Sequence, residues 1–132
     1  MKPGFRGVAI LTAALFFLIG MLWLMAPNVM LSDWGVALTP SLALLGRRSA
    51  ALYFGIAAMF FFARNAEPST ARSALLKGMV LACLMLAGLG VFELAAGHVT
   101  PKILIPVVLE ITMSLAFLYV GRGQPLRSVR AR

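Results

Sequence analysis

Acidic residues, histidine and cysteine are all scarce in this chain. Its 132 residues include only four Asp or Glu, one His and one Cys, against twelve Lys or Arg. A single cysteine, Cys83, excludes an intrachain disulfide and a CxxC redox pair, and we interpret it as a small apolar packing residue. One histidine is too few for a typical zinc site, so the sequence predicts no metal.

Motifs for catalysis are missing as well. We find no nucleophile paired with a base, no phosphate-binding loop and no cofactor signature in the sequence. No catalytic residue and no cofactor are therefore assigned. Whether the protein is an enzyme stays open, and the missing motifs favour a protein that is not one.

Charged residues are too few for a soluble domain. They make up 12% of the chain, compared with about 25% in an ordinary soluble protein, while 61% of the residues are hydrophobic. Apolar runs of about 20 residues recur, and each is long enough to cross roughly 30 Å of hydrocarbon as a helix. The sequence therefore predicts an integral membrane protein in contact with the lipid bilayer.

The net charge of +8 does not indicate a nucleic-acid-binding protein. The basic residues lie at the ends of the apolar runs and form no stripe along one face. No aromatic residues alternate with them to stack on bases. Charge in these positions orients membrane helices instead.

Four apolar segments predict an all-α, four-helix bundle that forms a single domain over residues 1–132. The first segment follows a basic leader, as a signal peptide would, but its apolar run is longer than usual. No A-x-A site precedes Pro27, so we expect an uncleaved helix. The expected spans, with a basic tail after them, are residues 7–26, 48–63, 74–96 and 103–120, and the tail is 121–132.

The residues between the first two spans, 27–46, mix polar, proline and apolar positions. We expect a short segment in the membrane interface there, with Trp34 at the level of the lipid headgroups. The second span begins near Arg48 or, if both arginines are helical, near Ser41. After the second span, Ser69 or Thr70 is expected to cap the third helix.

The basic residues are distributed unequally between the two sides that four spans define. One side carries three of them, Arg47, Arg48 and Lys102, and the side with both termini carries the other nine. The positive-inside rule therefore predicts cytoplasmic termini, and we expect a multi-pass protein of a bacterial inner membrane. The arginines near the C-terminus are expected to attract anionic lipid headgroups: Arg122, Arg127, Arg130 and Arg132.

Six ionisable residues are predicted to form a cluster near the outer leaflet: Glu93, Glu110, Arg47, Arg48, His98 and Asp33. Both glutamates lie inside spans, about one to two turns below the outer surface. A carboxylate facing lipid costs roughly 2.5 kcal/mol or more at the bilayer centre, and less near the interface. The glutamates should therefore face the bundle and be paired or protonated, and the long side chains of the two arginines are the best partners.

Two interpretations of this cluster stay open. One is a ligand or proton site that opens to the outside, and the other is a structural Arg–Glu clamp that keeps the helices in register. His98 is interpreted as a solvated turn residue rather than a metal ligand, and Asp33 as part of an interfacial turn. Gly90 and Gly97 share the face of Glu93, where they would let a neighbouring helix approach closely. On the fourth span, a partly polar stripe joins Pro106, Glu110 and Ser114.

Two stretches, GRRSAALYFGIAAMFFFAR and GHVTPKILIPVVLE, resemble the small DoxX-like bacterial membrane proteins and a neighbouring four-span family of unknown function. In the first stretch an arginine opens a span and a polar loop ends it. In the second, a Gly/Pro turn precedes a glutamate inside a span. The resemblance covers most of the chain from about Leu45 onward. It implies a four-helix bundle in a bacterial inner membrane and, for some relatives, association with redox partners, but it supplies no catalytic residue.

Three classes of function follow. The first, which we take as the prediction, is a non-enzymatic accessory or scaffold protein that binds a lipid, a membrane partner or a second copy of itself. The second is a small proton-coupled transporter in which Glu93 or Glu110 exchanges a proton for a cationic substrate. The third is a membrane enzyme acting on a lipid-like substrate, with a glutamate as acid or base and His98 assisting.

Overall fold

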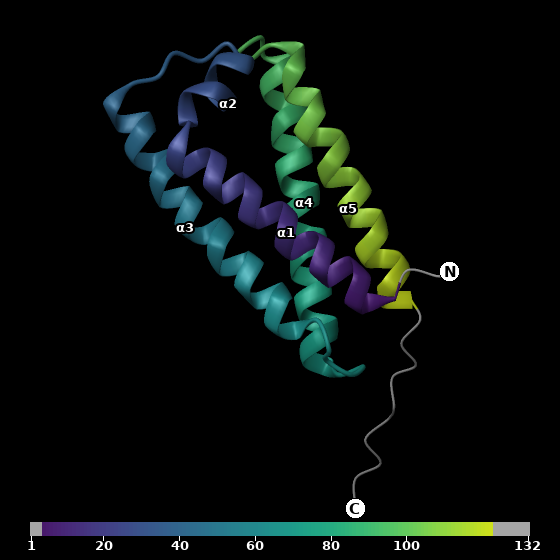
Figure 1. Ribbon diagram of the computed structural model, residues 1–132. Helices are drawn as coiled ribbons and strands as arrows, with labels where there is room; N and C mark the ends of the chain where they lie inside the picture. The colour runs from purple at the N-terminus through teal and green to yellow at the C-terminus, as the bar shows by residue number, and fades with distance from the viewer. Residues whose placement is uncertain (1–3, 123–132) are drawn as a thin grey trace, which may run out of the picture.

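Helices make up most of the described part of the chain. The computed structural model describes residues 4–122, and no strand occurs in that range. The expected all-α fold is therefore confirmed. The elements, shown in Figure 1, are α1 (Phe5–Met25), α2 (Pro27–Asp33), α3 (Pro40–Ala63), α4 (Thr70–Ala95), the 3-10 turn η1 (Pro101–Ile103) and α5 (Leu104–Arg122).

Three of the four long helices have the length and composition to cross a membrane. They are α1, α4, and α5 together with the η1 turn that precedes it. The α3 helix is not among them, because Arg47 and Arg48, two turns from its start, lower its hydropathy. The expectation of four apolar spans is thus met for three helices, and the passage of α3 through a membrane stays a prediction.

The second long helix begins earlier than the main prediction placed it. Proline suits the first position of a helix, where its missing N–H is no loss, and α3 begins at Pro40. The hydroxyl of Thr39 caps it by accepting a hydrogen bond from Leu42 N at 3.2 Å. Both arginines are therefore helical, as in the alternative prediction. The expected cap of α4 is also present, and it is Ser69.

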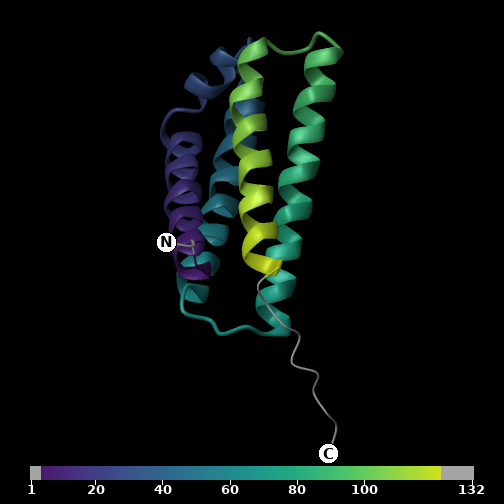
Figure 2. The ribbon, with the colours of Figure 1, turned by 90° about the vertical axis from the view of Figure 1, so that its right-hand side faces the viewer.

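The long helices form two antiparallel hairpins. One consists of α1 packed on α3, the other of α4 packed on α5, and contacts between the hairpins are fewer. All four helices run lengthwise, and α2 lies across the upper end of the bundle (Figures 1 and 2). The start of α1 and the end of α5 both lie at the opposite, lower end (Figure 1).

Glycines allow the close approach of helices within each hairpin. In the α1/α3 hairpin, a Cβ on Gly46 would come within 2.7 Å of the Trp23 ring. In the α4/α5 hairpin, a Cβ on Gly90 would come within 2.6 Å of a Val107 methyl. Close backbone approach increases the van der Waals contact that holds membrane helices together. The expected role of Gly90 is confirmed, whereas Gly97 lies in a turn with no side chain near it.

The hairpins meet at the lower end of the bundle, which we call the core end. Residues from all four long helices form one buried apolar cluster there. Its largest fully buried members are Phe60 of α3 and Phe117 of α5, which are 0% and 1% exposed. Their rings stack with centroids 5.5 Å apart. Apolar packing therefore joins the hairpins at the core end.

The opposite end, which we call the cavity end, is organised by turns. Both α2 and α4 finish in a Schellman motif, in which a residue in the left-handed conformation follows the helix. Glycine adopts that conformation without strain, and the two positions are Gly35 at φ +77° and Gly97 at φ +76°. The residue after each glycine donates its N–H back to the helix. For α4 this bond joins His98 N to Glu93 O at 3.0 Å.

A tether joins the hairpins at the cavity end. Thr100, in the loop after α4, donates its N–H to the Trp34 carbonyl at 3.0 Å and its hydroxyl to the Asp33 carbonyl at 2.5 Å. Lys102 Nζ also lies 2.6 Å from Asp33 Oδ1. These bonds connect the second hairpin to the end of α2. The hairpins are thus joined at both ends of the bundle, by different kinds of contact.

Candidate functional site

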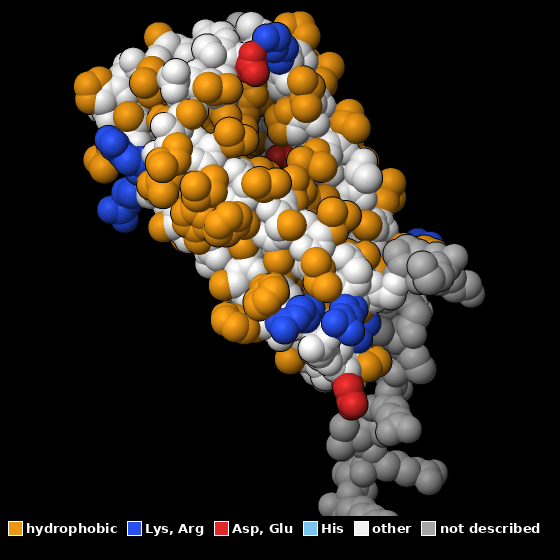
Figure 3. Space-filling view, in the orientation of Figure 1, with side chains coloured by type: hydrophobic (Ala, Val, Ile, Leu, Met, Phe, Trp, Pro, Cys, Tyr) orange, Lys and Arg blue, Asp and Glu red, His pale blue; other side chains and the backbone are white. Residues whose placement is uncertain are grey.

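A cavity of about 300 Å³ lies between the hairpins, toward the cavity end. All four long helices line it, together with Trp34 and Val99 from the tethered loops. Most of the lining is apolar or aromatic, and the rings of Phe16 and Tyr53 pack against each other with centroids 5.7 Å apart. Figure 3 shows a hollow on the side of the molecule, between α1 and α5, whose rim is mostly apolar. The volume is at the lower end of the roughly 300–1,000 Å³ found for small-molecule sites.

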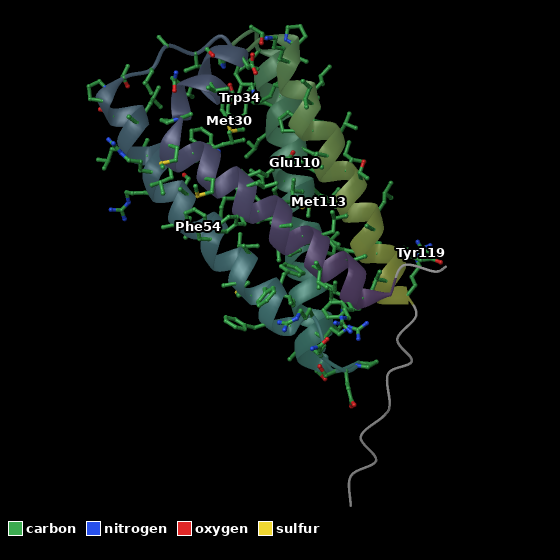
Figure 4. The ribbon with its side chains drawn as sticks, viewed as in Figure 1. Met30, Trp34, Phe54, Glu110, Met113 and Tyr119 are labelled. Atoms are coloured by element: carbon green, nitrogen blue, oxygen red, sulfur yellow. The ribbon has the colours of Figure 1, made fainter. Side chains whose placement is uncertain are left out.

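Glu110 is a partly buried acidic residue that lines this cavity. Figure 4 labels it on α5, and a recessed acidic side chain is visible at the same place in the hollow of Figure 3. Its Oε2 atom is buried and has no hydrogen-bond partner within residues 4–122. A buried polar atom without a partner costs about 1–3 kcal/mol, and more if it is charged. A polar group retained at such a cost inside a membrane helix is a candidate for function.

Ser114 lies one helical turn after Glu110, on the same face of α5. The residue is 2% exposed, and its hydroxyl has no hydrogen-bond partner in the described part of the chain. Two threonines of the long helices instead donate their hydroxyls to their own backbone, Thr12 to the Val8 carbonyl at 2.8 Å and Thr112 to the Val108 carbonyl at 2.7 Å. The expected polar stripe on this helix is therefore present, and it carries two groups whose hydrogen bonds the chain leaves incomplete.

Glu93 lies on α4 and lines the same cavity. Its side chain is 43% exposed, and its Oε2 lies 2.7 Å from Nδ1 of His98. The Schellman motif explains this pair, because it folds the residue after Gly97 back over the last turn of α4. The structure thus brings both predicted glutamates to one cavity. Glu93 has a hydrogen-bonding partner from the chain in His98, whereas Oε2 of Glu110 has no partner among the described residues.

Asp33 and Lys102 form an ion pair at the cavity end. Their side chains are 53% and 62% exposed, so the pair contributes little stability by itself. Its position is more important than its energy. Together with the Thr100 hydrogen bonds, it fixes the two loops that carry Trp34 and Val99 beside the cavity.

Arg47 and Arg48 do not pair with Glu93 or Glu110 within residues 4–122, so the expected partners are wrong and the clamp interpretation finds no support. Both are exposed, and neither takes part in an ion pair within residues 4–122. The reason is the pairing of the helices: α3 packs on α1, and its basic side chains project from the side of the molecule, away from the hollow (Figure 3). Arg122 is exposed at the end of α5. The other tail arginines lie outside the described residues: Arg127, Arg130 and Arg132.

A second hollow, of about 210 Å³, lies along α1 and α5 next to the cavity. We call it the α1/α5 groove; Leu109 and Met113 line both it and the cavity. Its lining is apolar apart from Thr12 and Thr112, whose hydroxyls bond to their own helices. Sequence reasoning missed the groove, because an apolar residue that lines a groove looks like one that faces lipid.

No group of three His, Cys, Asp or Glu side chains is placed to hold a metal ion in the described part of the chain. No protein-family model matches the chain, and neither a curated protein nor a solved structure matches it. The resemblance to DoxX-like proteins therefore stays a prediction. The cavity is therefore the feature of the molecule that bears on its function.

Proposed function

We propose that the protein is a four-span membrane protein that binds a lipid-like ligand in the cavity between its hairpins. The observation that carries this proposal is the Glu110 carboxyl, whose Oε2 is buried without a partner beside an apolar cavity. Sites for small molecules commonly combine an apolar lining with a few placed polar groups. A bound ligand would complete the hydrogen bonding of the carboxyl and cover the apolar lining. Binding of a membrane-protein partner or a second copy stays a prediction.

Four crossings, with both termini in the cytoplasm of a bacterial inner membrane, are part of the proposal. The α3 helix has 24 residues and packs along α1. At 1.5 Å per residue it is about 36 Å long, enough to cross the hydrocarbon. Its two arginines are exposed near one end, where long side chains can extend to the membrane surface. Basic residues are more numerous at the core end, which supports placing that end in the cytoplasm.

Labelling of single cysteines tests this topology. Cys83 is buried and is the one cysteine of the chain, so Cys83→Ser gives a background without thiols. Cysteines introduced at Ala37, before α3, and at Ala66, after it, are then treated with a membrane-impermeant maleimide on intact cells. We expect labelling of Ala37→Cys and protection of Ala66→Cys. Equal labelling of the two would contradict the crossing of α3.

Native mass spectrometry tests ligand binding. We expect wild-type protein, purified from membranes in mild detergent, to retain a lipid-like molecule. Glu110→Gln keeps the size of the side chain and should lose most of the bound ligand, because the carboxyl charge is removed. Glu67→Gln is the matched control, because it makes the same chemical change in an exposed loop. The proposal is wrong if wild-type protein carries no such molecule and takes up none from a lipid extract.

A proton-coupled transporter is the second candidate. Glu93, which is half exposed, and Glu110, whose Oε2 is buried, line the same cavity, as proton exchange with a substrate would need. Transport also needs a path to the other side, and the buried cluster joins the hairpins at the core end. Binding is therefore the better-supported function. Cation uptake into proteoliposomes that is driven by a proton gradient and lost in Glu110→Gln would favour transport.

A further inference from the structure

The cavity contains acidic side chains without basic ones. Glu93 and Glu110 line it, and no Lys, Arg or His does among the described residues. Two basic groups of the cavity end have acidic partners of their own: Lys102 lies on Asp33, and His98 lies on Glu93. The arginines of α3 project away from the hollow (Figure 3). The cavity is therefore complementary to a cation supplied from outside the described chain.

The α1/α5 groove lies beside the cavity and extends along α5 from the level of Glu110 toward the core end. Ala116, which lines the groove, is six residues after Glu110, or about 9 Å along the helix axis. Leu109 and Met113 line both hollows, so the groove is adjacent to the cavity. A linear molecule with its head group at the carboxyl can therefore lay an apolar chain in the groove. The groove volume of about 210 Å³ favours one unbranched chain over two.

The position of the hollow favours a ligand that arrives from the bilayer. Figure 3 shows it on the long side of the bundle, with hydrophobic side chains around it. The α1 and α5 helices that border it both have the length and composition of membrane spans. An amphiphile with a charged head and an apolar tail resides at the membrane interface and can enter sideways.

We propose that the ligand is a single-chain amphiphile with a primary amine head, whose ammonium group binds Glu110 and whose chain lies in the α1/α5 groove. This inference rests on the proposed function and narrows it to one chemical class. Charge-assisted hydrogen bonds are roughly twice as strong as neutral ones, and a low local dielectric strengthens them. An alcohol of the same length fills the groove equally well but lacks the charge. A fatty acid would place two carboxyl groups together.

Competition binding in nanodiscs tests the head group. Wild-type protein in phosphatidylcholine nanodiscs is titrated with tritiated dodecylamine, and dodecanol and dodecanoate compete as probes of equal chain length. We expect the amine to bind at least about tenfold more tightly than the alcohol, and Glu110→Gln to abolish that preference. Glu67→Gln, in an exposed loop, should retain it.

A pair of variants on α5 tests the chain. Ala116→Phe places a ring in the α1/α5 groove, and Leu115→Phe places a similar ring on a side chain that is 62% exposed. We expect Ala116→Phe to weaken dodecylamine binding several-fold and to leave the shorter hexylamine unaffected. Leu115→Phe should change neither. This arm stays informative even if Glu110→Gln fails to fold.

The outcomes separate this inference from the function on which it rests. Equal affinity for amine and alcohol, or a preference that survives Glu110→Gln, would overturn the amine class and leave lipid binding intact. Binding of none of the three probes by wild-type protein would contradict both. Replacing half of the phosphatidylcholine with phosphatidylethanolamine should not displace dodecylamine. Displacement would show that a two-chain amine lipid occupies the site and would overturn the single-chain assignment.

Discussion

The core end and the cavity end of the bundle consist of similarly apolar helices, yet only the core end is filled. At the core end, Phe60 and Phe117 are fully buried and stack on each other. At the cavity end, the same four helices enclose about 300 Å³ and leave the Oε2 atom of Glu110 without a partner. Hydropathy along the chain does not distinguish the two ends, because it records composition and not which side chains meet.

The two ends also differ in what they contribute to stability. Close packing of large rings stabilises the core end, since each void would forfeit van der Waals contacts. The cavity end keeps a void and two incompletely bonded polar groups, Glu110 and Ser114, which destabilise the ligand-free protein. Proteins commonly accept such a local cost at the place where they bind a ligand.

Removing a ring from the core end should have the largest effect on stability. Phe60→Ala opens a void where the wild-type side chain is 0% exposed. We expect a loss toward the lower end of about 3–5 kcal/mol, because the unfolded chain in detergent is still in apolar surroundings. The free energy of unfolding is measured by titration with denaturing detergent. Phe62→Ala, at a position that is 79% exposed, is the matched control, and similar losses in both variants would contradict the role of the core end.

Removing the carboxyl group of Glu110 from the cavity end should raise the free energy of unfolding, whereas Phe60→Ala lowers it. Glu110→Leu eliminates the unpartnered oxygen, and we expect the ligand-free protein to gain about 1–3 kcal/mol in the same unfolding assay. The variant should also lose its preference for the amine probe. Glu93→Leu, which breaks the pair with His98, should give no such gain. A loss of stability in Glu110→Leu would mean that this carboxyl is structural.

A glycine substitution should weaken the tether at the cavity end alone. Gly35 has φ +77°, and an added Cβ would lie 2.8 Å from a Thr100 methyl. We expect Gly35→Ala to cost about 1–2 kcal/mol, because the left-handed conformation strains a side chain. Gly88→Ala, inside α4 with no atom within 4 Å of the added Cβ, should be neutral or should stabilise by up to about 1 kcal/mol. Thermal unfolding of the two variants measures the difference.

The ion pair of the tether should have the smallest effect. Asp33→Asn and Lys102→Gln, with the double variant, form a cycle that isolates the coupling between two exposed side chains. We expect a coupling of about 0.2–1 kcal/mol that falls as salt is added. A larger coupling that persists in high salt would show that the pair is shielded from water.

Residue types at fixed positions in the sequence predicted the helical segments of the fold and the height of the two glutamates along the bundle. The helical segments, the Ser69 cap and the turn at Gly97 follow from residue types at fixed positions. The convergence of Glu93 and Glu110 follows from a hairpin, which brings residues near its turn to the same height. Such predictions need only the chain direction and the helical rise.

The partner of each charge could not be predicted in this way. The expected bond from Arg47 or Arg48 to a glutamate required α3 to pack on α4 or α5, and α3 packs on α1 instead. The choice of neighbour depends on close approach at positions such as Gly46 and Gly90, where only the folded chain shows what lies opposite. The α1/α5 groove was missed for the same reason, since it is a property of two helices together.

Because the hollow is on the long side of the bundle, the occupancy of the site should depend on the ligand concentration in the membrane (Figure 3). A ligand that enters from the bilayer is at equilibrium with its mole fraction among the lipids, and its concentration in water matters only through partitioning. Each methylene adds about 0.8 kcal/mol to that partitioning, so a longer amine would look tighter in aqueous units without gaining any contact. Saturation of the site would thus follow the composition of the membrane. The fraction of protein with bound ligand would then report the mole fraction of the amphiphile in the membrane.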